Sequence, residues 1–399
     1  MKRLQGTLSL PGSKSESNRA LMIAAYGGFP LEVDNLSEAH DTVLLKALLE
    51  HPSPQVDCED AGTVARFLMT YLAGKPGTWT LTGTKRLCER PMAPLVDALR
   101  QLGADIAGDG LPLKIVGRPL KGGAVTLDAS LSSQFASSLL MAAPTWENGL
   151  ELTLTGDPVS MPYLEMTVKM MEYYGVRVIW EGNTITVPHQ SYQPRPFKVD
   201  ADWSAASYWY EMLALSEGGT LLLKGLKPDS LQGDSRVADL FKPLGVRTEY
   251  VGEGVLIASD GVFPTICKPL EFDVSNTPDV FPSILVSCVV LHIEAVFYGI
   301  STLFLKESDR VNSLITELSK YYTFINIMDV NKLIIGKSSL MDSSVNGMNL
   351  SFSIFKDHRL AMALAGLSVR FDQVAVDRPD VVNKSYPAFW DDVAHIVGS

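Results

Sequence analysis

The chain has 399 residues, of which 46% are hydrophobic and 20% are charged, and its formal net charge at pH 7 is −11. This length and composition are typical of a soluble globular protein with two domains and large hydrophobic cores. The negative charge argues against nucleic acid as a partner. It does not exclude small anionic substrates, because the potential at a site depends on the local charges.

The sequence shows no feature typical of a membrane or secreted protein. The longest apolar run, near residues 284–293, is too short to span a bilayer. No signal peptide precedes Lys2 and Arg3, so we expect no membrane partner and a cytoplasmic location. The cysteines have no metal-ligand spacing, and we interpret them as free thiols in a reducing compartment: Cys58, Cys88, Cys267 and Cys288.

The first informative stretch is residues 10–25. Ser13 followed three residues later by Glu16 is a capping box, and the apolar run behind it predicts a helix. Lys14 and Ser15 then lie in the first turn, with Arg19 one turn further along, which predicts an anion site at the helix start. An ordinary capped helix with two surface cations is the alternative. A P-loop is excluded because its glycine and lysine must be adjacent.

A repeated α/β unit emerges along the chain. Its alternating or β-branched runs predict strands at 30–36, 79–83, 150–156, 220–225, 295–299 and 373–377. In four copies a helix ends at a similar junction, marked by Gly103, Gly175 and Gly245 and by Tyr322 in a degenerate copy, and a short strand such as 113–116 or 332–335 follows. Six copies divide naturally into two domains of three. The first copy is the weakest, because residues 51–54 replace a strand pair.

Polar residues recur where the predicted helices start. Serine and aspartate are common helix caps, so each one alone is explained by capping. Several of these starts also carry a cation or a spare hydroxyl, and together they predict a large anion-binding site. The starts are 60–63, 132–134, 160–163, 202–204, 277–279, 306–310 and 357–359.

These motifs, taken in order, resemble those of the 5-enolpyruvylshikimate-3-phosphate (EPSP) synthases over almost the whole chain. The matching stretches are 11–15 with Arg19, 60–63 with Arg66, 89–91, 132–134, Ser160 with Tyr163, 278–279, 306–310, 357–359 and Lys384. The resemblance implies an α/β, two-domain enolpyruvyl transferase fold with six βαβαββ repeats, three per domain around a pseudo-threefold axis, the first of them shortened. The implied domains are residues 1–13 with 201–399, which contain both termini, and residues 14–200.

The resemblance also implies the reaction. The enolpyruvyl group of phosphoenolpyruvate is transferred to the 5-hydroxyl of shikimate 3-phosphate, and phosphate is released. We expect these two small molecules as partners, no metal or organic cofactor, a monomer, and inhibition by glyphosate, which competes for the phosphoenolpyruvate pocket.

Site residues are carried over position by position from the resemblance. Asp279 and Glu307 resemble the acid/base pair, and Lys14 is the third catalytic residue. The implied shikimate 3-phosphate contacts are Lys14, Ser15, Arg19, Ser132, Ser133, Gln134, Ser160, Asp279 and Lys306. The implied phosphoenolpyruvate contacts are Lys14, Gly62, Arg90, Gln134, Arg310, His358, Arg359 and Lys384. Cations suit a reaction that brings two phosphates and two carboxylates together, and carboxylates among cations can be tuned for proton transfer.

Other interpretations remain open on the sequence alone. Asp279 is also explained as a helix cap, and Glu307 with Arg310 as an exposed ion pair. A UDP-N-acetylglucosamine enolpyruvyl transferase shares the fold but needs a different N-terminal signature and a glycine-flanked cysteine loop, which the surroundings of Cys88 do not provide. A non-catalytic phosphate-binding scaffold has no need of an acid/base pair.

Three positions depart from the family pattern. Glu59-Asp60 stands where many members have Gly-Asn, Phe67 replaces a frequent proline, and Thr302 stands where some members have asparagine. The first two could reshape the loop near Gly62, and no substrate contact is assigned to Thr302.

Overall fold

The computed structural model describes residues 2–262, 266, 268–324, 326–341 and 349–398. Contacts divide the chain into two compact units, Ser13–Val199 and a discontinuous unit of Met1–Gly12 with Asp200–Ser399. We call them the inserted unit and the terminal unit. Cys267, interpreted above as a free thiol, lies outside the described residues, whereas Cys58, Cys88 and Cys288 are free cysteines.

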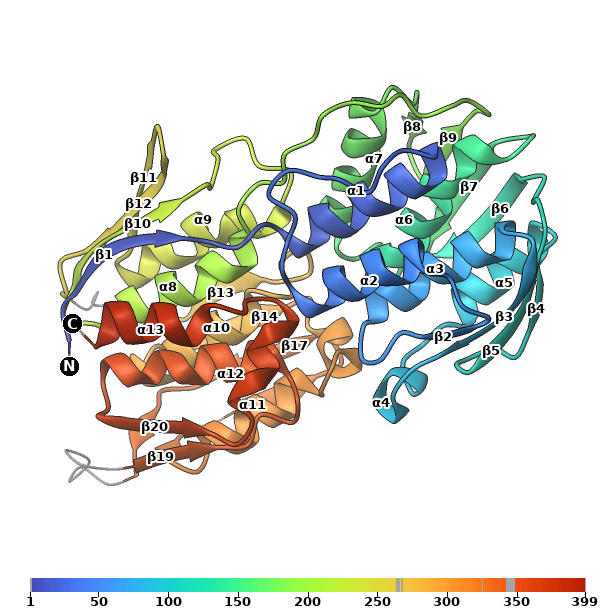
Figure 1. Ribbon diagram of the computed structural model, residues 1–399. Coiled ribbons are helices and arrows are strands. Elements are labelled where there is room, and N and C mark those ends of the chain that lie inside the picture. Colours follow the sequence, from blue (N-terminus) through green and yellow to red (C-terminus); the bar gives the residue numbers. More distant parts are fainter. Residues whose placement is uncertain (1, 263–265, 267, 325, 342–348, 399) are drawn as a thin grey trace. The chain divides into compact units, whose positions relative to one another are not determined.

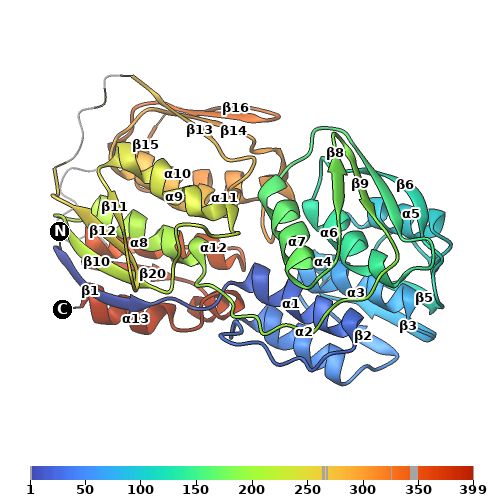
Figure 2. The same ribbon diagram turned by 90° about the horizontal axis from the view of Figure 1, so that it is seen from above.

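The inserted unit holds two four-stranded sheets of the same topology (Figures 1 and 2). Their orders are β2-β3-β5-β4, from β2 (Gln55–Asp57), β3 (Gly77–Thr82), β4 (Asp105–Ala107) and β5 (Leu113–Gly117), and β6-β7-β9-β8, from β6 (Gly123–Asp128), β7 (Leu150–Thr155), β8 (Ile179–Glu181) and β9 (Thr184–Val187). In each sheet the first pair is parallel and the other two pairs are antiparallel.

Helices of the inserted unit pack against one another and against the sheets. They are α1 (Lys14–Gly27), α2 (His40–Glu50), α3 (Gly62–Gly74), α4 (Lys85–Cys88), α5 (Ala93–Gln101), α6 (Ser133–Ala142) with the 3₁₀ turn η1 (Ala143–Thr145), and α7 (Met161–Tyr173). Contacts join α1 to α3, α6 and α7, and α3 to α6, so the helices whose starts carry the predicted site residues form one layer.

The terminal unit repeats the same sheet topology twice. The orders are β1-β10-β12-β11, from β1 (Leu4–Ser9), β10 (Gly219–Lys224), β11 (Arg247–Val251) and β12 (Gly254–Ser259), and β13-β14-β17-β16, from β13 (Leu270–Asp273), β14 (Ala295–Tyr298), β16 (Asn326–Asp329) and β17 (Lys332–Ile335). Two short pairs complete its described strands: β19 (Asn349–Phe352) with β20 (Gln373–Val376), parallel, and β15 (Tyr322–Thr323) with β18 (Ser339–Leu340), antiparallel.

The helices of the terminal unit follow the same α/β alternation. They are α8 (Trp203–Leu215), α9 (Val237–Phe241), α10 (Phe281–Val290), α11 (Arg310–Leu318), α12 (His358–Ala365) and α13 (Phe389–Val397). The 3₁₀ turns are η2 (Gly233–Arg236), η3 (Lys242–Leu244), η4 (Ser301–Leu305), η5 (Gly366–Val369) and η6 (Pro379–Lys384). Among the described residues no helix is long and apolar enough to cross a bilayer.

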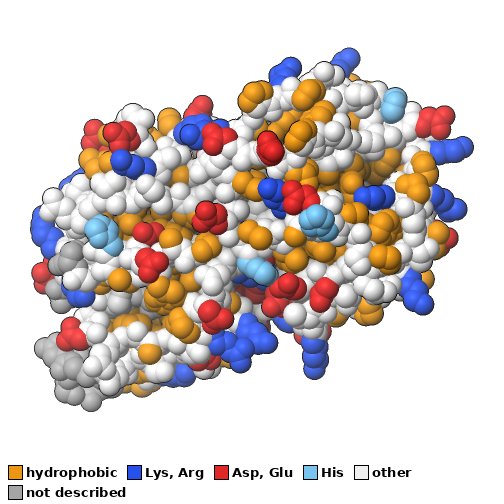
Figure 3. Space-filling model, in the orientation of Figure 1, with side chains coloured by type: hydrophobic (Ala, Val, Ile, Leu, Met, Phe, Trp, Pro, Cys, Tyr) orange, Lys and Arg blue, Asp and Glu red, His pale blue; other side chains and the backbone are white. Residues whose placement is uncertain are grey.

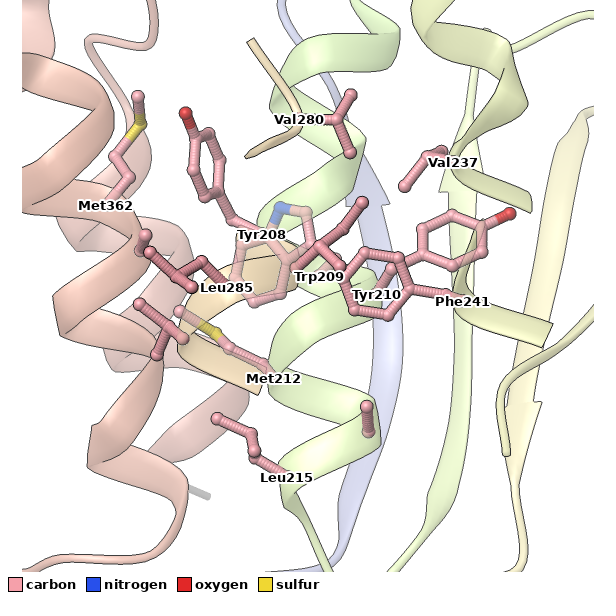
Figure 4. Close-up of a cluster of buried hydrophobic side chains, with 14 of the residues drawn as sticks. Tyr208, Trp209, Tyr210, Met212, Leu215, Val237, Phe241, Val280, Leu285 and Met362 are labelled. Carbon is pink, nitrogen blue, oxygen red and sulfur yellow. The ribbon is translucent and has the colours of Figure 1, made fainter. Parts of the chain in front are cut away.

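Helix α8 forms the centre of the terminal unit's core. All of its side chains are buried, including the consecutive aromatic residues Tyr208, Trp209 and Tyr210. Because consecutive residues point to different sides of a helix, neighbouring elements must cover every face of α8. Figure 4 shows Tyr208 beside Leu285 and Met362, while Tyr210 lies beside Phe241. Burying this much aromatic surface fixes the start of α8 and the helices α10 and α12 that pack on it.

The glycine junctions of the repeat are confirmed by their backbone. Gly103, Gly175 and Gly245 have φ of +91°, +85° and +87°, a left-handed conformation that favours glycine at the end of a helix. The expected strands at 79–83, 150–156, 220–225, 295–299 and 373–377 are found, each within one or two residues, as β3, β7, β10, β14 and β20.

The strand predicted at 30–36 is wrong. Only one isolated bridge forms there, between Asp34 and Lys198. Asn35 has φ of +55°, which breaks the extended conformation, and the side chains of 30–36 are half-buried or exposed. Apolar and polar residues do alternate here, but no neighbouring strand of the described chain pairs with the segment, so its apolar side chains have no sheet face on which to pack. The first repeat is therefore reduced to α1, α2 and this loop.

Candidate active site

Helix α1 begins as the capping box predicts. Ser13 is the N-cap, and its hydroxyl accepts a hydrogen bond from the Glu16 amide at 3.4 Å. Lys14 is mostly buried, with Nζ 3.0 Å from the Asp41 carboxylate of α2. The ammonium is thus held in place at the helix start beside Ser15, where the helix dipole also favours an anion.

Arg19 is buried and ties three helices together. Its guanidinium donates to the Thr167 hydroxyl at 2.6 Å, to the Ser137 hydroxyl at 3.4 Å, and to the carbonyls of Ser15 and Tyr163 at 3.0 Å each. Burial lowers the pKa of Arg19 to about 10. Its positive charge lies beneath the start of α1, and its hydrogen bond to the Ser15 carbonyl holds the first turn in place.

A second group of cations surrounds the start of α3. The N-cap residue Ala61 makes no side-chain capping bond, which leaves the first-turn N–H groups for another acceptor. A Cβ on Gly62 would lie 2.6 Å from Arg90 Nη1 and 2.7 Å from Arg66 Nη1. Both guanidiniums therefore lie against this glycine, and both residues are buried.

Gln134 connects this group to α6. Its Oε1 accepts from Arg66 Nη1 at 2.8 Å, and its Nε2 donates to the Thr63 hydroxyl at 2.9 Å. Ser132 is the N-cap of α6 and accepts from the Gln134 amide at 3.2 Å, with buried Ser133 following it. The predicted residues Gly62, Arg90 and Gln134 thus come together within the inserted unit.

Ser160 differs from an ordinary cap. It precedes α7 with φ of +57° and makes no side-chain capping bond, although its side chain is buried. A left-handed serine costs free energy of order 1 kcal/mol. A cap in the usual extended conformation would avoid that cost, so capping alone does not explain this position.

In the terminal unit a single arginine binds three carboxylates. Arg310 is 1% exposed; its Nε lies 2.8 Å from Asp357, its Nη1 2.8 Å from Asp279 and its Nη2 2.9 Å from Glu307. Burial alone would lower the pKa of Arg310, but the carboxylates of Asp357, Glu307 and Asp279 raise it above its ordinary value. Glu307 and Arg310 are therefore not an exposed ion pair.

Asp279 lies between two guanidiniums. Its Oδ2 accepts from Arg359 Nη2 at 2.6 Å, and Arg359 also donates to the Tyr208 hydroxyl at 3.3 Å. Burial alone would raise the pKa of Asp279, but Arg359, Arg310 and Lys306 hold it well below its ordinary value. The helix-cap alternative is wrong, because Val280 is the N-cap of α10 and no side-chain capping bond forms there.

The remaining predicted residues of the terminal unit adjoin this cluster. Lys384 Nζ lies 3.9 Å from Glu307, and His358 Nδ1 lies 3.9 Å from Asp357, which caps α12. Lys306 is half-buried and close enough to Asp279 to lower its pKa. The predicted set is thus one cluster of buried and half-buried ionisable side chains: Asp279, Lys306, Glu307, Arg310, His358, Arg359 and Lys384.

Sequence reasoning missed four residues that support these clusters. Arg66 lies in a matched motif and Asp357 at a helix start, but neither position alone indicates a supporting role. Asp41 and Asp234 carried no signal. Burial, followed by the charge of Asp279, raises the pKa of Asp234 to about 7, and its carboxylate accepts a hydrogen bond from Ser204.

The departures from the family pattern have local structural effects. Glu59 has φ of +48° and pairs with His40 at 2.7 Å. Phe67 is fully buried, with the Arg19 guanidinium 5.7 Å from its ring centroid. Cys88 is half-buried and its thiol contacts the Gly83 carbonyl at 3.5 Å. The described residues contain no group of three or more histidines, cysteines and carboxylates that could hold a metal ion.

Repeated α/β units with cations and carboxylates at their helix starts define an enolpyruvyl transferase fold. A solved EPSP synthase structure from Acinetobacter baumannii shares this fold, with a TM-score of 0.77 at 22% identity over 99% of this chain and 96% of that chain. The family model for EPSP synthase (3-phosphoshikimate 1-carboxyvinyltransferase) matches residues 45–393. The chain belongs to the EPSP synthase family.

Two relatives show how far the similarity extends. A 3-phosphoshikimate 1-carboxyvinyltransferase of Bacteroides fragilis is 41% identical over 398 residues, covering 98% of this chain and 95% of the relative. One from Vibrio cholerae is 30% identical over 426 residues, covering 98% and 97%.

Proposed function

We propose roles for individual side chains in the reaction of this family. The chain transfers the enolpyruvyl group of phosphoenolpyruvate to the 5-hydroxyl of shikimate 3-phosphate, a step of aromatic amino-acid biosynthesis. In this reaction the hydroxyl oxygen forms a bond to C2 of phosphoenolpyruvate and loses its proton, while C3 gains one. The C2–O bond to phosphate then breaks, and C3 returns a proton as the double bond re-forms.

The inserted unit supplies anion-binding groups in this proposal. Lys14, Ser15, Ser132, Ser133 and Ser160 bind shikimate 3-phosphate at helix starts, and Arg19 adds positive charge from beneath α1. Gly62, Arg90 and Gln134 bind phosphoenolpyruvate together with Lys14, and Arg66 holds the Gln134 amide in its orientation. The uncapped start of α3 beside two guanidiniums supports this assignment.

The terminal unit supplies the proton-transfer groups. Asp279 and Glu307 exchange the protons, with Lys14 as the third catalytic residue. Asp279 and Lys306 also contact shikimate 3-phosphate, while Arg310, His358, Arg359 and Lys384 contact phosphoenolpyruvate. The single observation that carries this proposal is the Arg310 cluster, in which Asp279 and Glu307 share one buried guanidinium at 2.8 and 2.9 Å.

This arrangement suggests how the carboxylates change basicity during the reaction. In the structure Arg359 and Arg310 stabilise ionised Asp279, which makes it a weak base. Anionic substrates compete for these two arginines, so substrate binding raises the basicity of Asp279 where it is needed.

A phosphate-release assay tests the function directly. Phosphoenolpyruvate with shikimate 3-phosphate should give stoichiometric phosphate, and phosphoenolpyruvate with UDP-N-acetylglucosamine should give none. Release only with the nucleotide sugar would favour the related transferase. No release with either acceptor, despite saturable binding of shikimate 3-phosphate, would favour a phosphate-binding scaffold.

We further propose a monomer located in the cytoplasm. Free cysteines in the described chain suit a reducing compartment. On the face shown in Figure 3, acidic, basic and hydrophobic side chains are mixed, without a broad field of one charge. Light scattering after size-exclusion chromatography tests the monomer, because a mass of twice 43.5 kDa would contradict it.

A further inference from the structure

A cavity of about 330 Å³ lies in the inserted unit, away from every residue assigned above. Its lining comes from the C-terminal ends of α1 and α3, the segment after β5, and η1 with the residue that follows it. Aromatic and proline side chains dominate: Tyr26, Tyr71, Trp146, Pro76 and Pro119. Trp146 is only 3% exposed, so the wall is part of the packed unit.

The helices themselves separate this cavity from the candidate active site. Helix α3 begins at Gly62, beside Arg90, and ends at Gly74, which lines the cavity. Twelve residues at 1.5 Å each place the two ends about 18 Å apart. Helix α1 likewise runs from Lys14 at the site to Tyr26 at the cavity.

The aromatic walls suit a flat ring. The rings of Tyr26 and Tyr71 meet edge to face, with centroids 5.5 Å apart and an interplanar angle of 69°. Leu120, 6% exposed, also lines the cavity. Aromatic and apolar side chains around a few polar groups are typical of a small-molecule pocket.

One polar group at this cavity has no partner within the described chain. The Tyr26 hydroxyl oxygen is buried, and no described atom forms a hydrogen bond with it. Burial raises the pKa of Tyr26 well above its ordinary value, so the phenol keeps its proton. A buried donor without an acceptor costs about 1–3 kcal/mol in general. Because this oxygen has almost no accessible surface, Tyr26 lines the cavity through its ring and not through its hydroxyl.

Charge at the cavity favours an anionic ligand group. Of the described residues that line it, Lys75 alone is charged. Its ammonium lies 5.2 Å from the ring centroid of Tyr71 and 6.0 Å from that of Trp79, which keeps it near the aromatic wall. The ends of α1 and α3 carry partial negative charge, but Lys75 is the C-cap of α3 and places a full positive charge there.

We propose that this cavity binds a small planar aromatic molecule carrying one carboxylate. The ring lies among Tyr26, Tyr71 and Trp146, and the carboxylate pairs with Lys75. The site is separate from the substrate contacts and does not depend on the roles proposed for them.

Phenylacetate is the test probe, with benzylamine and benzyl alcohol as ligands of similar size and different charge. Titration followed by ligand-observed NMR should show saturable phenylacetate binding with a dissociation constant of about 1 mM or tighter. Benzyl alcohol should bind about tenfold more weakly, and benzylamine more weakly still. Equal or tighter binding of benzylamine, or no saturation by phenylacetate, overturns the proposal.

A blocking variant shows where the probe binds, because the cationic substrate site could also attract a carboxylate. A Cβ on Gly74 would meet no atom within 4 Å, and the residue ends a helix with ordinary φ, so Gly74→Leu can fold while filling the cavity. We expect at least about tenfold weaker phenylacetate binding with unchanged turnover. Gly252→Leu, at an equally open glycine of the terminal unit, should change neither. Unchanged phenylacetate binding by Gly74→Leu places the probe elsewhere and overturns the proposal.

A charge variant tests the role of Lys75. Lys75→Met should weaken the binding of phenylacetate about tenfold and leave the binding of benzyl alcohol unchanged. Lys169→Met, at an exposed lysine of α7, should affect the binding of neither ligand. Thermal unfolding of every variant checks that it is folded, and Gly74→Ala serves as a milder filling variant. If Lys75→Met weakened the binding of both ligands equally, Lys75 would only pack against the ligand ring, and the assigned carboxylate contact would be overturned.

Discussion

At the scale of single residues, Arg310 decides how the proposed acid/base pair can act. Its ion pairs fix the orientation of Asp279 and Glu307 before any substrate arrives, and together with Arg359 it holds the pKa of Asp279 below its ordinary value. A buried charge that keeps partners on several sides tolerates the loss of one of them better than an isolated pair does. Substitution of one carboxylate should therefore affect chemistry more than folding.

The first prediction tests the two carboxylates. Asp279→Asn and Glu307→Gln should each lower turnover by about 10² to 10⁴ and change substrate binding only a few-fold, because each group is needed for proton transfer. Glu271→Gln, at an exposed position of β13, is the matched control and should retain full turnover. Steady-state kinetics and thermal unfolding separate the effects, and near-normal turnover would return the substituted residue to a structural role.

The second prediction concerns Gly62. Because a Cβ there would lie within 3 Å of both Arg66 and Arg90, Gly62→Ala must displace two buried guanidiniums, at a cost of about 1–3 kcal/mol in ligand binding. We expect a rise in the KM for phosphoenolpyruvate and a larger, roughly 10- to 200-fold, loss of glyphosate inhibition, because glyphosate is slightly bulkier.

Gly74→Ala in the same helix is the control, because its Cβ would meet open space. Inhibition curves at fixed phosphoenolpyruvate measure the effect. Equal glyphosate sensitivity of wild type and Gly62→Ala would show that Gly62 does not line this pocket.

The third prediction uses the pKa of Asp234, about 7. Above that pH an ionised Asp234 attracts Arg359 and repels phosphoenolpyruvate, at a cost of about 1 kcal/mol or about fivefold in affinity. The KM for phosphoenolpyruvate should therefore rise with pH through neutrality in wild type and stay flat in Asp234→Asn, whose amide can still accept from Ser204. Asp239→Asn, at an exposed site in α9, should keep the wild-type slope. A wild-type slope in Asp234→Asn would assign the titration to another group.

A residue of the candidate site can be predicted from the sequence when the pattern that marks it is local. Ser13, Lys14 and Arg310 belong to short local motifs, and a local motif can be read without knowing the fold. Asp41 pairs with Lys14 across 27 residues and Asp357 with Arg310 across 47. Such partners are chosen by tertiary packing, which leaves no spacing rule in the sequence. The assigned contacts with the two substrates stay predictions.

At the scale of elements, α8 carries an unusual buried glutamate. Glu211 is fully buried, and neither carboxylate oxygen has a hydrogen-bond partner in the described chain. A Cβ on Gly366, which begins η5, would lie 2.9 Å from the Glu211 carboxyl, so the two elements pack tightly here. Burial raises the pKa of Glu211 well above its ordinary value, so the folded chain favours the protonated, neutral carboxyl.

The fourth prediction follows from that shift. The folded pKa lies above the ordinary value of 4.5, so the folded form holds a proton that the unfolded form releases. Stability should then fall as pH rises from about 4.5 toward the folded pKa. Glu211→Gln should remove this slope and gain stability over wild type as pH increases. Glu172→Gln, at an exposed site in α7, should not. Urea unfolding over a pH series measures the effect, and parallel wild-type and Glu211→Gln curves would contradict it.

Strands were predicted correctly where a segment with alternating apolar and polar residues pairs with a neighbouring strand. β7 and β10 show the expected pattern of buried and less buried side chains and pair on both edges. Residues 30–36 have similar alternation but form only the Asp34 bridge. An alternating sequence indicates that a segment suits a half-buried strand. It does not indicate whether another part of the chain supplies the strand that must pair with it.

At the scale of the whole molecule, the two units differ in continuity. The inserted unit is one uninterrupted segment with both of its sheets and its own buried core, whereas the terminal unit is assembled from two segments. The fifth prediction is that residues 13–199 expressed alone fold cooperatively, because no strand of their sheets comes from outside the segment.

Thermal unfolding by circular dichroism and resistance to proteolysis test this prediction. Residues 200–399 alone are the informative comparison, because they lack β1, the edge partner of β10. We expect them to be less stable and to gain stability when a peptide of residues 1–12 is added. A non-cooperative inserted unit would contradict the prediction.

Strand β1 also has a consequence for synthesis on the ribosome. It pairs in parallel with β10 over residues 4–9 and 219–224 and lies beside α13, where Lys2 Nζ contacts the Val397 carbonyl at 2.6 Å (Figures 1 and 2). At 5–20 residues per second, β10 leaves the ribosome about 10–40 s after β1. During that time β1 waits as an unpaired, half-apolar strand while the inserted unit can already fold. Nascent chains stalled before residue 219 should therefore bind chaperones through their first dozen residues.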